Sequence, residues 1–358
     1  MIRWRAGEVT AVLRSWPGAV EIEAVLDEAD GEHTRRALAY TGLVGCPEPG
    51  DRVLLNTTAL EMGLGTGGYA MVVAVPDRLP PDPDDSGHLV KARYTSSQVT
   101  VLGADEQDSP HHAALRDAHE VGGMPVVTAD LHSALPAVLA GVEAERPGTR
   151  VVYVMLDGGA LPAVFSRSLA GLRSSGRLAA TVTAGQAFGG DLETVTVHTG
   201  LLAARHVLDA EIAVVAQGPG NLGTGTPWGF SGVSCGEAVN AAAVLEGRPV
   251  ASLRVSEADG RERHRGVSHH SITAYGRVAL APADVVLPRL AGAFGERVRT
   301  EAAVLGERHR LVEVAIDGLD TALRELPVPL SSMGRTLDED GAYFLTAAAA
   351  GRHAAALL

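Results

Sequence analysis

The alternation of short apolar runs with helix-like segments after residue 88 constrains the fold of this chain most. The runs are rich in valine, alanine and leucine and cover residues 98–105, 124–130, 150–157, 177–185, 211–218 and 249–257. Such nearly continuous apolar runs are typical of parallel strands that are covered on both faces. In 131–145, the apolar residues recur at the spacing of one helix face. This rhythm predicts an α/β fold with a doubly wound, mostly parallel sheet and right-handed crossovers.

The first 75 residues have a different pattern. Short β-rich runs follow one another there, separated by the turn sequences SWPG, DEADGE and PEPGD, with no helical segment between them. This pattern predicts a small N-terminal β-barrel domain over residues 1–75. The proline- and aspartate-rich segment 76–87 predicts a linker. Residues 88–358 are then expected to form a Rossmann-like α/β domain that ends in an alanine-rich helix at 343–358.

Composition disfavours several classes of function. The formal net charge of −13 argues against a nucleic-acid-binding protein, because such proteins need a basic surface. No apolar run approaches the roughly 20 residues that span a bilayer, so no membrane partner is expected. Two cysteines, Cys46 and Cys235, cannot build a disulfide framework, and the N-terminus lacks the apolar stretch of a signal peptide. We therefore expect a reduced, cytoplasmic protein, and its composition is compatible with a homo-oligomer.

Polar residues gather where the predicted strands end. Asp130 and His132 lie at the end of the run 124–130, and Asp157 ends the run 150–157. In open α/β sheets, ligands bind beyond the carboxyl ends of the strands. We therefore predict that Asp130, His132 and Asp157 are catalytic residues in one cleft.

The segment QGPGNLGTGT at residues 217–226 is the strongest single motif. Its glycines free the backbone to turn sharply and to present N–H groups to an anion. No Gly-Lys-Ser/Thr sequence follows, so it is not a Walker A motif. The alternative is a flexible surface loop without a ligand. The residues expected to bind a ligand here are Gly218, Gly220, Asn221, Gly223 and Thr224.

The stretch HRGVSHHS at residues 264–271 places three histidines at another junction. Ser268 is the expected N-cap of the next helix and a ligand-binding residue, so His269 and His270 lie in the first helical turn, where the dipole favours neutral imidazole. Neutral imidazole can act as a general base or as a metal ligand. With the carboxylates above, this catalytic set could hold a divalent metal ion, although no strict metal motif is present. Alternatively, one histidine binds a loop carbonyl and the other faces solvent.

Lys91 is the one lysine among 30 basic residues. A lysine can carry out amine chemistry that arginine cannot, although a coding bias toward arginine would also explain its isolation. In the sequence HLVKARYT, Lys91 and Arg93 would lie on the same side of a strand. We expect both to bind an anionic ligand.

Several of these motifs together resemble a bacterial family known as domain-of-unknown-function family 3866. The segments that carry the resemblance are LNTTALEMGLGTGGYA, GHLVKARYT, DGGALPAVFSR, QAFGGDLE, QGPGNLGTGT and RHRGVSHHS. The resemblance covers most of residues 1–340 and implies a cytoplasmic bacterial protein. It implies no activity, so the function has to be argued from the residues themselves.

The residues favour an enzyme that acts on a small anionic or phosphorylated metabolite, by hydrolysis or group transfer, in a cleft at the carboxyl ends of the strands. One alternative is a regulatory protein that binds a nucleotide or metabolite without turnover. Another is an interaction module that uses the β-barrel for docking. Clustered aspartate and histidine side chains favour the enzyme, whereas a cleft with only glycines and arginines would favour the binding protein.

Overall fold

The computed structural model describes residues 1–28, 31–83 and 87–358. The chain forms two compact units, of which the first contains Met1–Ser86 and Ala92–Thr100 and the second contains Gly87–Lys91 and Val101–Leu358. Residues 84–86 of the expected linker 76–87 lie outside the described residues.

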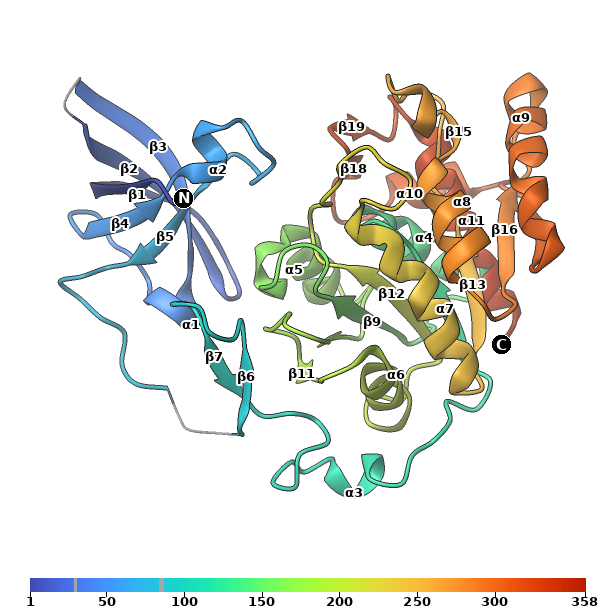
Figure 1. The fold of residues 1–358 in the computed structure, drawn as a ribbon, viewed down its shortest axis with the longest axis horizontal. Coiled ribbons are helices and arrows are strands. Elements are labelled where there is room, and N and C mark those ends of the chain that lie inside the picture. Colours follow the sequence, from blue (N-terminus) through green and yellow to red (C-terminus); the bar gives the residue numbers. More distant parts are fainter. Residues whose placement is uncertain (29–30, 84–86) are drawn as a thin grey trace. The chain divides into compact units, whose positions relative to one another are not determined.

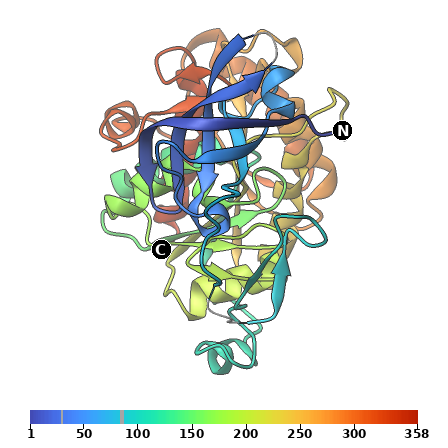
Figure 2. The ribbon, with the colours of Figure 1, turned by 90° about the vertical axis from the view of Figure 1, so that its left-hand side faces the viewer.

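The first unit contains the predicted β-barrel (Figure 2). Its strands are β1 (Trp4–Trp16), β2 (Ala19–Glu28), β3 (Gly31–Tyr40), β4 (Arg52–Asn56) and β5 (Ala70–Ala74). They close in the order β1-β2-β3-β5-β4, with β3 and β5 parallel and the other pairs antiparallel. This arrangement is that of the OB-fold, a five-stranded Greek-key barrel. Two single-turn helices that the sequence did not predict, α1 (Thr41–Val44) and α2 (Thr58–Glu61), lie between the strands.

The barrel core follows from the two-residue period of its strands. Val20, Ile22, Ala24 and Leu26 alternate along β2 and are all buried. Because successive side chains of a strand point to opposite faces, this alternation directs one set inward. A compact aliphatic core therefore forms without aromatic residues at its centre.

The second unit contains the predicted doubly wound sheet, with eight strands that are all parallel (Figure 1). In spatial order the strands are β11 (Leu192–Glu193), β10 (Ala180–Thr183), β9 (Val151–Leu156), β12 (Ile212–Gln217), β8 (Pro125–Thr128), β13 (Arg248–Ser252), β16 (Asp284–Pro288) and β17 (Arg310–Val314). The central strands β8, β9 and β12 are buried almost throughout, as their apolar runs require.

Helices cover both faces of this sheet. One face packs against α4 (Leu135–Glu145), α5 (Arg167–Ser174), α10 (Leu319–Arg324) and α11 (Gly341–Ala356). The other face packs against α6 (Val197–His206), α7 (Ser234–Val244), α8 (His269–Thr273) with the π-helical stretch Ala274–Val278, and α9 (Gly292–Ala302). The short helix α3 (His112–Leu115) precedes β8. Within the described ranges, no helix is long and apolar enough to cross a membrane.

One strand was predicted wrongly. The run 98–105 does not form a strand of the parallel sheet; its short strand β7 (Val99–Val101) lies outside that sheet, as does β6 (Leu89–Lys91), and the run contacts the sheet through an isolated parallel bridge between Gly103 and Glu193 of β11. The run is interrupted at Gly103, whose N–H donates to the Glu106 carboxylate at 2.7 Å. The chain turns there, and a turn with its own carboxylate acceptor prevents a longer strand.

The alanine-rich helix α11 packs against α4 at backbone distance. A Cβ atom at Gly141 would lie 1.8 Å from the carbonyl oxygen of Ala348, and one at Gly351 would lie 2.0 Å from that of Val138. Glycine is therefore required at both positions, because any side chain would force the helices apart. The alanines of α11 serve the same purpose, and this close packing covers the middle of the sheet.

The centre of the sheet provides a crevice at its carboxyl edge. The neighbouring strands β12, β8 and β13 are followed by helices on opposite faces of the sheet. The helix α4 follows β8 on one face, whereas α7 follows β12 and α8 follows β13 on the other face. Such divergence opens a space beyond the strand ends, where α/β proteins bind ligands. The short hairpins β14 (Val255–Ser256) with β15 (Gly266–Val267), and β18 (Ser331–Ser332) with β19 (Arg335–Thr336), complete the unit.

Candidate functional site

Three histidines form a cluster beside the ends of β8 and β13. His264 precedes β15, and His269 and His270 begin α8. Their ring centroids lie 4.4 to 4.9 Å apart. One nitrogen from each ring can be chosen so that all three lie within 4.8 Å of one another. We call these residues the histidine cluster. His264 and His270 are buried and His269 is partly exposed.

Local structure fixes the orientation of these rings. Ser268 caps α8, as predicted, and its Oγ accepts a hydrogen bond from the backbone N–H of His270 at 3.2 Å. The same Oγ lies 2.7 Å from His264 Nδ1. The buried ring of Phe230 stacks on the His270 ring, with centroids 3.7 Å apart and planes 4° from parallel. The cap and the stacking partner hold two of the imidazoles in place.

Charged side chains from β8, from the chain after β13 and from the turn after β14 adjoin the cluster. Asp130 Oδ2 lies 3.7 Å from His270 Nδ1 and 3.8 Å from Arg254 Nη1. On the other side, Arg254 Nη2 lies 3.7 Å from Asp259 Oδ2. Asp130, Arg254 and Asp259 are each less than 5% exposed. These buried charges are thus close but are not joined by short hydrogen bonds.

Several buried polar atoms at this place have no hydrogen-bond partner among the described residues. They are Asp130 Oδ2, Arg254 Nη2, His269 Nε2 and Gln217 Oε1. Buried polar groups in folded proteins nearly always have a partner, because an unmet donor or acceptor costs about 1–3 kcal/mol. Such atoms gathered at one sheet edge therefore make this place the candidate ligand site.

Burial and nearby positive charge keep His264 and His269 neutral. Desolvation, with the guanidinium of Arg254 as the next cause, lowers the pKa of His264 to about 3. Desolvation and the neighbouring His270 lower the pKa of His269 to about 4. By contrast, hydrogen bonds from Arg261 hold the pKa of the Asp259 carboxyl well below its usual range. At neutral pH, the site therefore combines uncharged imidazoles with an ionised carboxylate.

The predicted residue Asn221 is linked to Asp130 through Gln217. Gln217 Nε2 donates to the backbone oxygen of Asp130 at 2.7 Å and to Asn221 Oδ1 at 2.9 Å. Asn221 lines a cavity of about 270 Å³. Among the described residues, none of those lining the cavity is an aspartate, glutamate, lysine or arginine. The lining is Leu131, His132, Ser133, Pro136, Ser168, Pro219, Gly220, Asn221, Pro329, Leu330, Ser331, Ser332 and Met333.

His132 belongs to a separate, complete network. Its Nδ1 lies 3.0 Å from Tyr153 Oη and its Nε2 lies 2.8 Å from Ser166 Oγ. Tyr153 Oη donates in turn to the backbone oxygen of Gln217 at 2.8 Å. Ser166 caps α5 by accepting from Leu169 N at 3.1 Å. Both nitrogens of His132 are occupied, and burial lowers its pKa to about 4.

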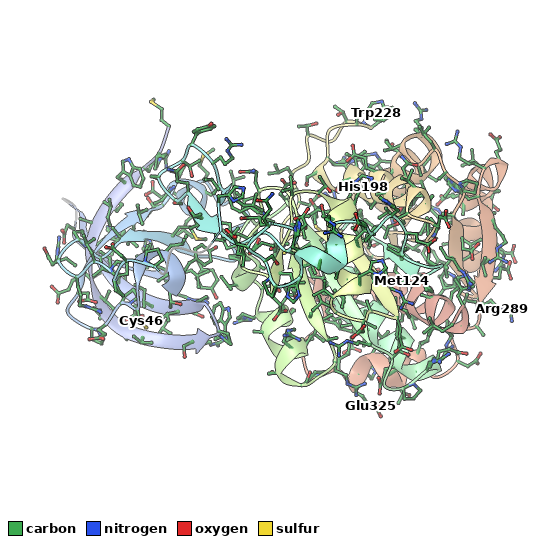
Figure 3. All side chains as sticks on the ribbon, turned by 90° about the horizontal axis from the view of Figure 1, so that it is seen from below. Cys46, Met124, His198, Trp228, Arg289 and Glu325 are labelled. Atoms are coloured by element: carbon green, nitrogen blue, oxygen red, sulfur yellow. The ribbon has the colours of Figure 1, made fainter. Side chains whose placement is uncertain are left out.

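The glycine-rich loop folds back on itself. Thr224 N donates to Gly229 O at 2.7 Å, and Gly223 pairs with Phe230 in an antiparallel bridge. Gly218 N donates to the carbonyl of Leu156 at 3.0 Å. Two of the N–H groups expected to bind an anion are thus already used by carbonyl oxygens. Trp228, which is 55% exposed, lies in the same loop (Figure 3).

The other predicted residues lie apart from the cluster's contacts. The Lys91 ammonium is buried and donates to the carbonyls of Ala187 at 3.0 Å and Thr194 at 2.8 Å. Asp157 Oδ2 accepts from Gln186 N at 2.8 Å. Arg93 belongs to the first unit, where its guanidinium stacks on the Tyr94 ring. Lys91 and Asp157 thus brace the loop that follows β10.

The sequence analysis missed four residues of this site: Arg254, Asp259, His264 and Gln217. One signal for Arg254 was present, because it interrupts the apolar run 249–257 that was expected to be buried on both faces. A charge inside such a run needs a partner, and therefore marks a special position. His264 lies in the same short stretch as His269, but only the fold brings its ring back against theirs.

Comparison with known proteins gives one match. Searches of curated proteins and of solved structures find no similar protein. The family model described as "Protein of unknown function (DUF3866)" matches residues 36–351, a range that begins within β3, leaves out β1 and β2, and includes the whole histidine cluster. The chain therefore belongs to the DUF3866 family, as its motifs indicated.

Proposed function

We propose that this protein is an enzyme, a hydrolase or group transferase, that acts on a small anionic metabolite at the crevice beside β8 and β13. The observation that carries the proposal is the unsatisfied guanidinium of Arg254. It is 2% exposed, and the one hydrogen bond found for it is a long contact of 3.4 Å from Nη1 to His270 Nδ1. Nη2 has no hydrogen-bond partner within the described part of the chain.

A buried guanidinium in this state favours an anionic ligand. Arginine has five N–H donors in a planar fork, and the fork matches the two oxygens of a phosphate or carboxylate. Leaving a charge buried without close partners is costly, because desolvation is not offset by short contacts. An oxyanion bound at Nη1 and Nη2 would offset that cost. Phosphate esters and carboxylates are therefore the expected substrates.

The neighbouring groups support chemistry as well as binding. Asp130 Oδ2 is a buried acceptor without a hydrogen bond and can take a proton from an attacking water or alcohol. The attacking oxygen then forms a bond to the phosphorus or acyl carbon. The bond to the leaving oxygen breaks, and that oxygen departs with the electron pair and is protonated from solvent. The neighbouring cavity, which lacks charged lining residues, suits the uncharged remainder of such a substrate.

The test is binding of inorganic phosphate and of a panel of phosphate monoesters to the full chain, followed by thermal unfolding. A ligand at 100 times its Kd stabilises a protein by about 2.7 kcal/mol. We expect Arg254→Gln to abolish this stabilisation and Arg254→Lys to reduce it. Arg289→Gln provides a matched control, because Arg289 is an exposed arginine in a loose ion pair with Glu313.

Two outcomes would change the proposal. If Arg254→Gln binds phosphate and the panel as tightly as the wild type does, Arg254 is not the anion anchor and the proposal is wrong. If the wild type binds a panel member without turning it over, the non-catalytic metabolite-binding protein becomes the better description.

A further inference from the structure

We propose that the histidine cluster binds one divalent metal ion of the zinc type, held by His264, His269 and His270. This inference deepens the proposed function, on which its catalytic meaning rests, because it places a metal ion next to the proposed anion anchor. The metal binding itself can be measured without any substrate.

The geometry of the three rings is close to that of a metal site. Tetrahedral zinc with bonds of about 2.0 Å to nitrogen requires ligand atoms ~3.3 Å apart. One nitrogen from each ring can be chosen so that the three lie within 4.8 Å of one another. The rings would therefore have to move closer together when an ion binds. Three protein ligands leave a fourth position open, which is the arrangement found in catalytic zinc sites.

The hydrogen bonds determine which nitrogens are available. His269 Nε2 is a buried atom without a hydrogen-bond partner in the described chain, so it is available as a ligand atom. His264 Nδ1 is occupied by Ser268 Oγ, and this leaves its Nε2 free. His270 Nδ1 faces Asp130 Oδ2 at 3.7 Å, so its Nε2 is also the remaining ligand atom.

This assignment also resolves the unsatisfied carboxylate. A metal on His270 Nε2 requires the proton on Nδ1, so the 3.4 Å contact from Arg254 Nη1 to this nitrogen would be given up and Nδ1 would donate to Asp130 Oδ2 after a small movement. Histidine ligands of metals commonly donate their second N–H to a carboxylate, which orients the ring and raises its basicity. The acceptor Asp130 Oδ2 and the donor His270 Nδ1 thus become partners. Ser268 has the equivalent role for His264.

The arrangement of the rings favours metal ligation by this cluster. Each of the three rings contributes a nitrogen that lies near one nitrogen of each of the other two, as the ligands of a single ion do. Arg254 adds positive charge beside the site, so the open position should hold an anion, either hydroxide or a substrate oxygen.

The donor set also identifies the class of metal. Three imidazoles suit zinc, cobalt, nickel or copper, whereas magnesium and calcium prefer oxygen ligands. A zinc-type ion would lower the pKa of a water bound at its open position to about 7. This favours hydrolysis over the transfer reactions that the proposed function also allows.

The test uses the full chain, stripped of metal by a chelator and dialysed in phosphate-free buffer against Zn²⁺, Co²⁺ or Mg²⁺. We expect one equivalent of Zn²⁺ per chain, a Co²⁺ visible spectrum of tetrahedral type, and no uptake of Mg²⁺. His269→Ala should weaken Zn²⁺ binding at least about a hundredfold, and Asp130→Asn about tenfold. The matched control is His198→Ala, which removes an exposed histidine on α6 (Figure 3) and should bind like the wild type.

Three results would overturn the proposal: no zinc uptake by the wild type, an octahedral Co²⁺ spectrum, or equal affinity of His269→Ala and His198→Ala. The Co²⁺ spectrum decides the matter even if His269→Ala is unstable. Arg254→Gln should keep its zinc. A protein that binds zinc but not phosphate would therefore contradict the proposed function and leave the metal site standing, and the reverse result would do the opposite.

Discussion

The single buried histidine His132 and the histidine cluster both lie beside the carboxyl ends of the same sheet, and they differ in how completely they are hydrogen-bonded. Around His132, both ring nitrogens have partners within 3.0 Å, and Tyr153 and Ser166 are themselves held by backbone groups. Around His269 and His270, the distances are longer and buried atoms remain without hydrogen bonds. Burial lowers the pKa of His132 and His269 alike, to about 4.

The comparison shows that a perturbed histidine is not by itself a sign of function. Structural networks lower the pKa of a buried imidazole as strongly as ligand sites do. The useful criterion is whether the hydrogen bonds are complete. A complete network stabilises the fold, whereas an incomplete one is tolerated because a ligand completes it and because active sites commonly sacrifice stability.

The largest expected difference is in stability. His132→Ala removes a buried ring and leaves the hydroxyls of Tyr153 and Ser166 with one partner fewer. We expect a loss of about 4 kcal/mol in the free energy of unfolding, from the cavity and the unmet polar groups. His269→Ala should cost less than about 1 kcal/mol. Urea unfolding of both variants measures this, and equal losses would remove the distinction between His132 and the histidine cluster.

Lys91 and Arg254 extend the comparison to buried cations. Lys91 donates to two carbonyls and lies 3.6 Å from Glu193 Oε2, so Lys91→Met should leave these acceptors unmet and cost about 3 kcal/mol. The contacts of Arg254 are longer, with ion pairs of 3.8 Å to Asp130 and 3.7 Å to Asp259, so Arg254→Met should destabilise the fold less than Lys91→Met does. Thermal and urea unfolding of the two variants give the result. A strongly destabilised Arg254→Met would indicate that Arg254 has a structural role.

The titration of His132 should make a measurable contribution to the pH dependence of stability. The pKa of His132 in the folded chain is about 4, below the unfolded value of 6.5. The unfolded chain therefore binds a proton at this residue more tightly, and lowering the pH favours unfolding. The stability that His132 confers is complete above pH 6.5 and is lost as the pH falls toward 4. Between pH 7 and pH 4.5 this loss amounts to about 2.5 kcal/mol. In His132→Asn the loss over the same interval should be smaller by that amount, and an unchanged pH profile would refute the assignment.

The smallest effect concerns the two serine caps. Ser166→Ala and Ser268→Ala each remove an N-cap, at a cost of about 1 kcal/mol. Ser166 also contacts His132 Nε2, and we expect a further loss of about 1 kcal/mol there. In Ser268→Ala, the additional consequence should instead be weaker Zn²⁺ binding, because His264 loses its orienting partner. Urea titration and zinc dialysis on both variants test this contrast.

The architecture was predictable because it depends on the spacing of apolar residues along the sequence, which differs between buried strands, half-buried strands and helices. The apolar runs of β8, β9 and β12 lie on buried strands, and the alternation in β2 predicts a barrel face. The prediction of a sheet strand over 98–105 was wrong because a local hydrogen bond at Gly103 turns the chain there, despite its apolar pattern. The single-turn helices α1 and α2 are too short to produce a helical period at all.

The candidate site was predictable only where a residue interacts with its neighbours in the sequence. Ser268 could be placed as a cap because a cap depends on its immediate neighbours. Arg254 and Gln217 could not, because their partners come from other strands. The role of His132 depends on its hydrogen bonds to Tyr153 and Ser166, which come from other segments of the chain. The residue spacing within the segment of His132 does not reveal these partners.

The close packing of α11 on α4 has a consequence for how the second unit is made. Gly141 and Gly351 fit against each other's helices, yet the whole of the sheet beyond β8 is synthesised between them. During synthesis on the ribosome, the sheet face that α11 covers stays exposed until α11 has been made. The barrel strands, by contrast, follow one another closely in the chain, so the barrel can close soon after they emerge. Asp340, which precedes α11, also binds Ser256 and Arg335 near the histidine cluster. A nascent chain therefore assembles its candidate site last, and chaperones that shield apolar sheet faces should bind it in that interval.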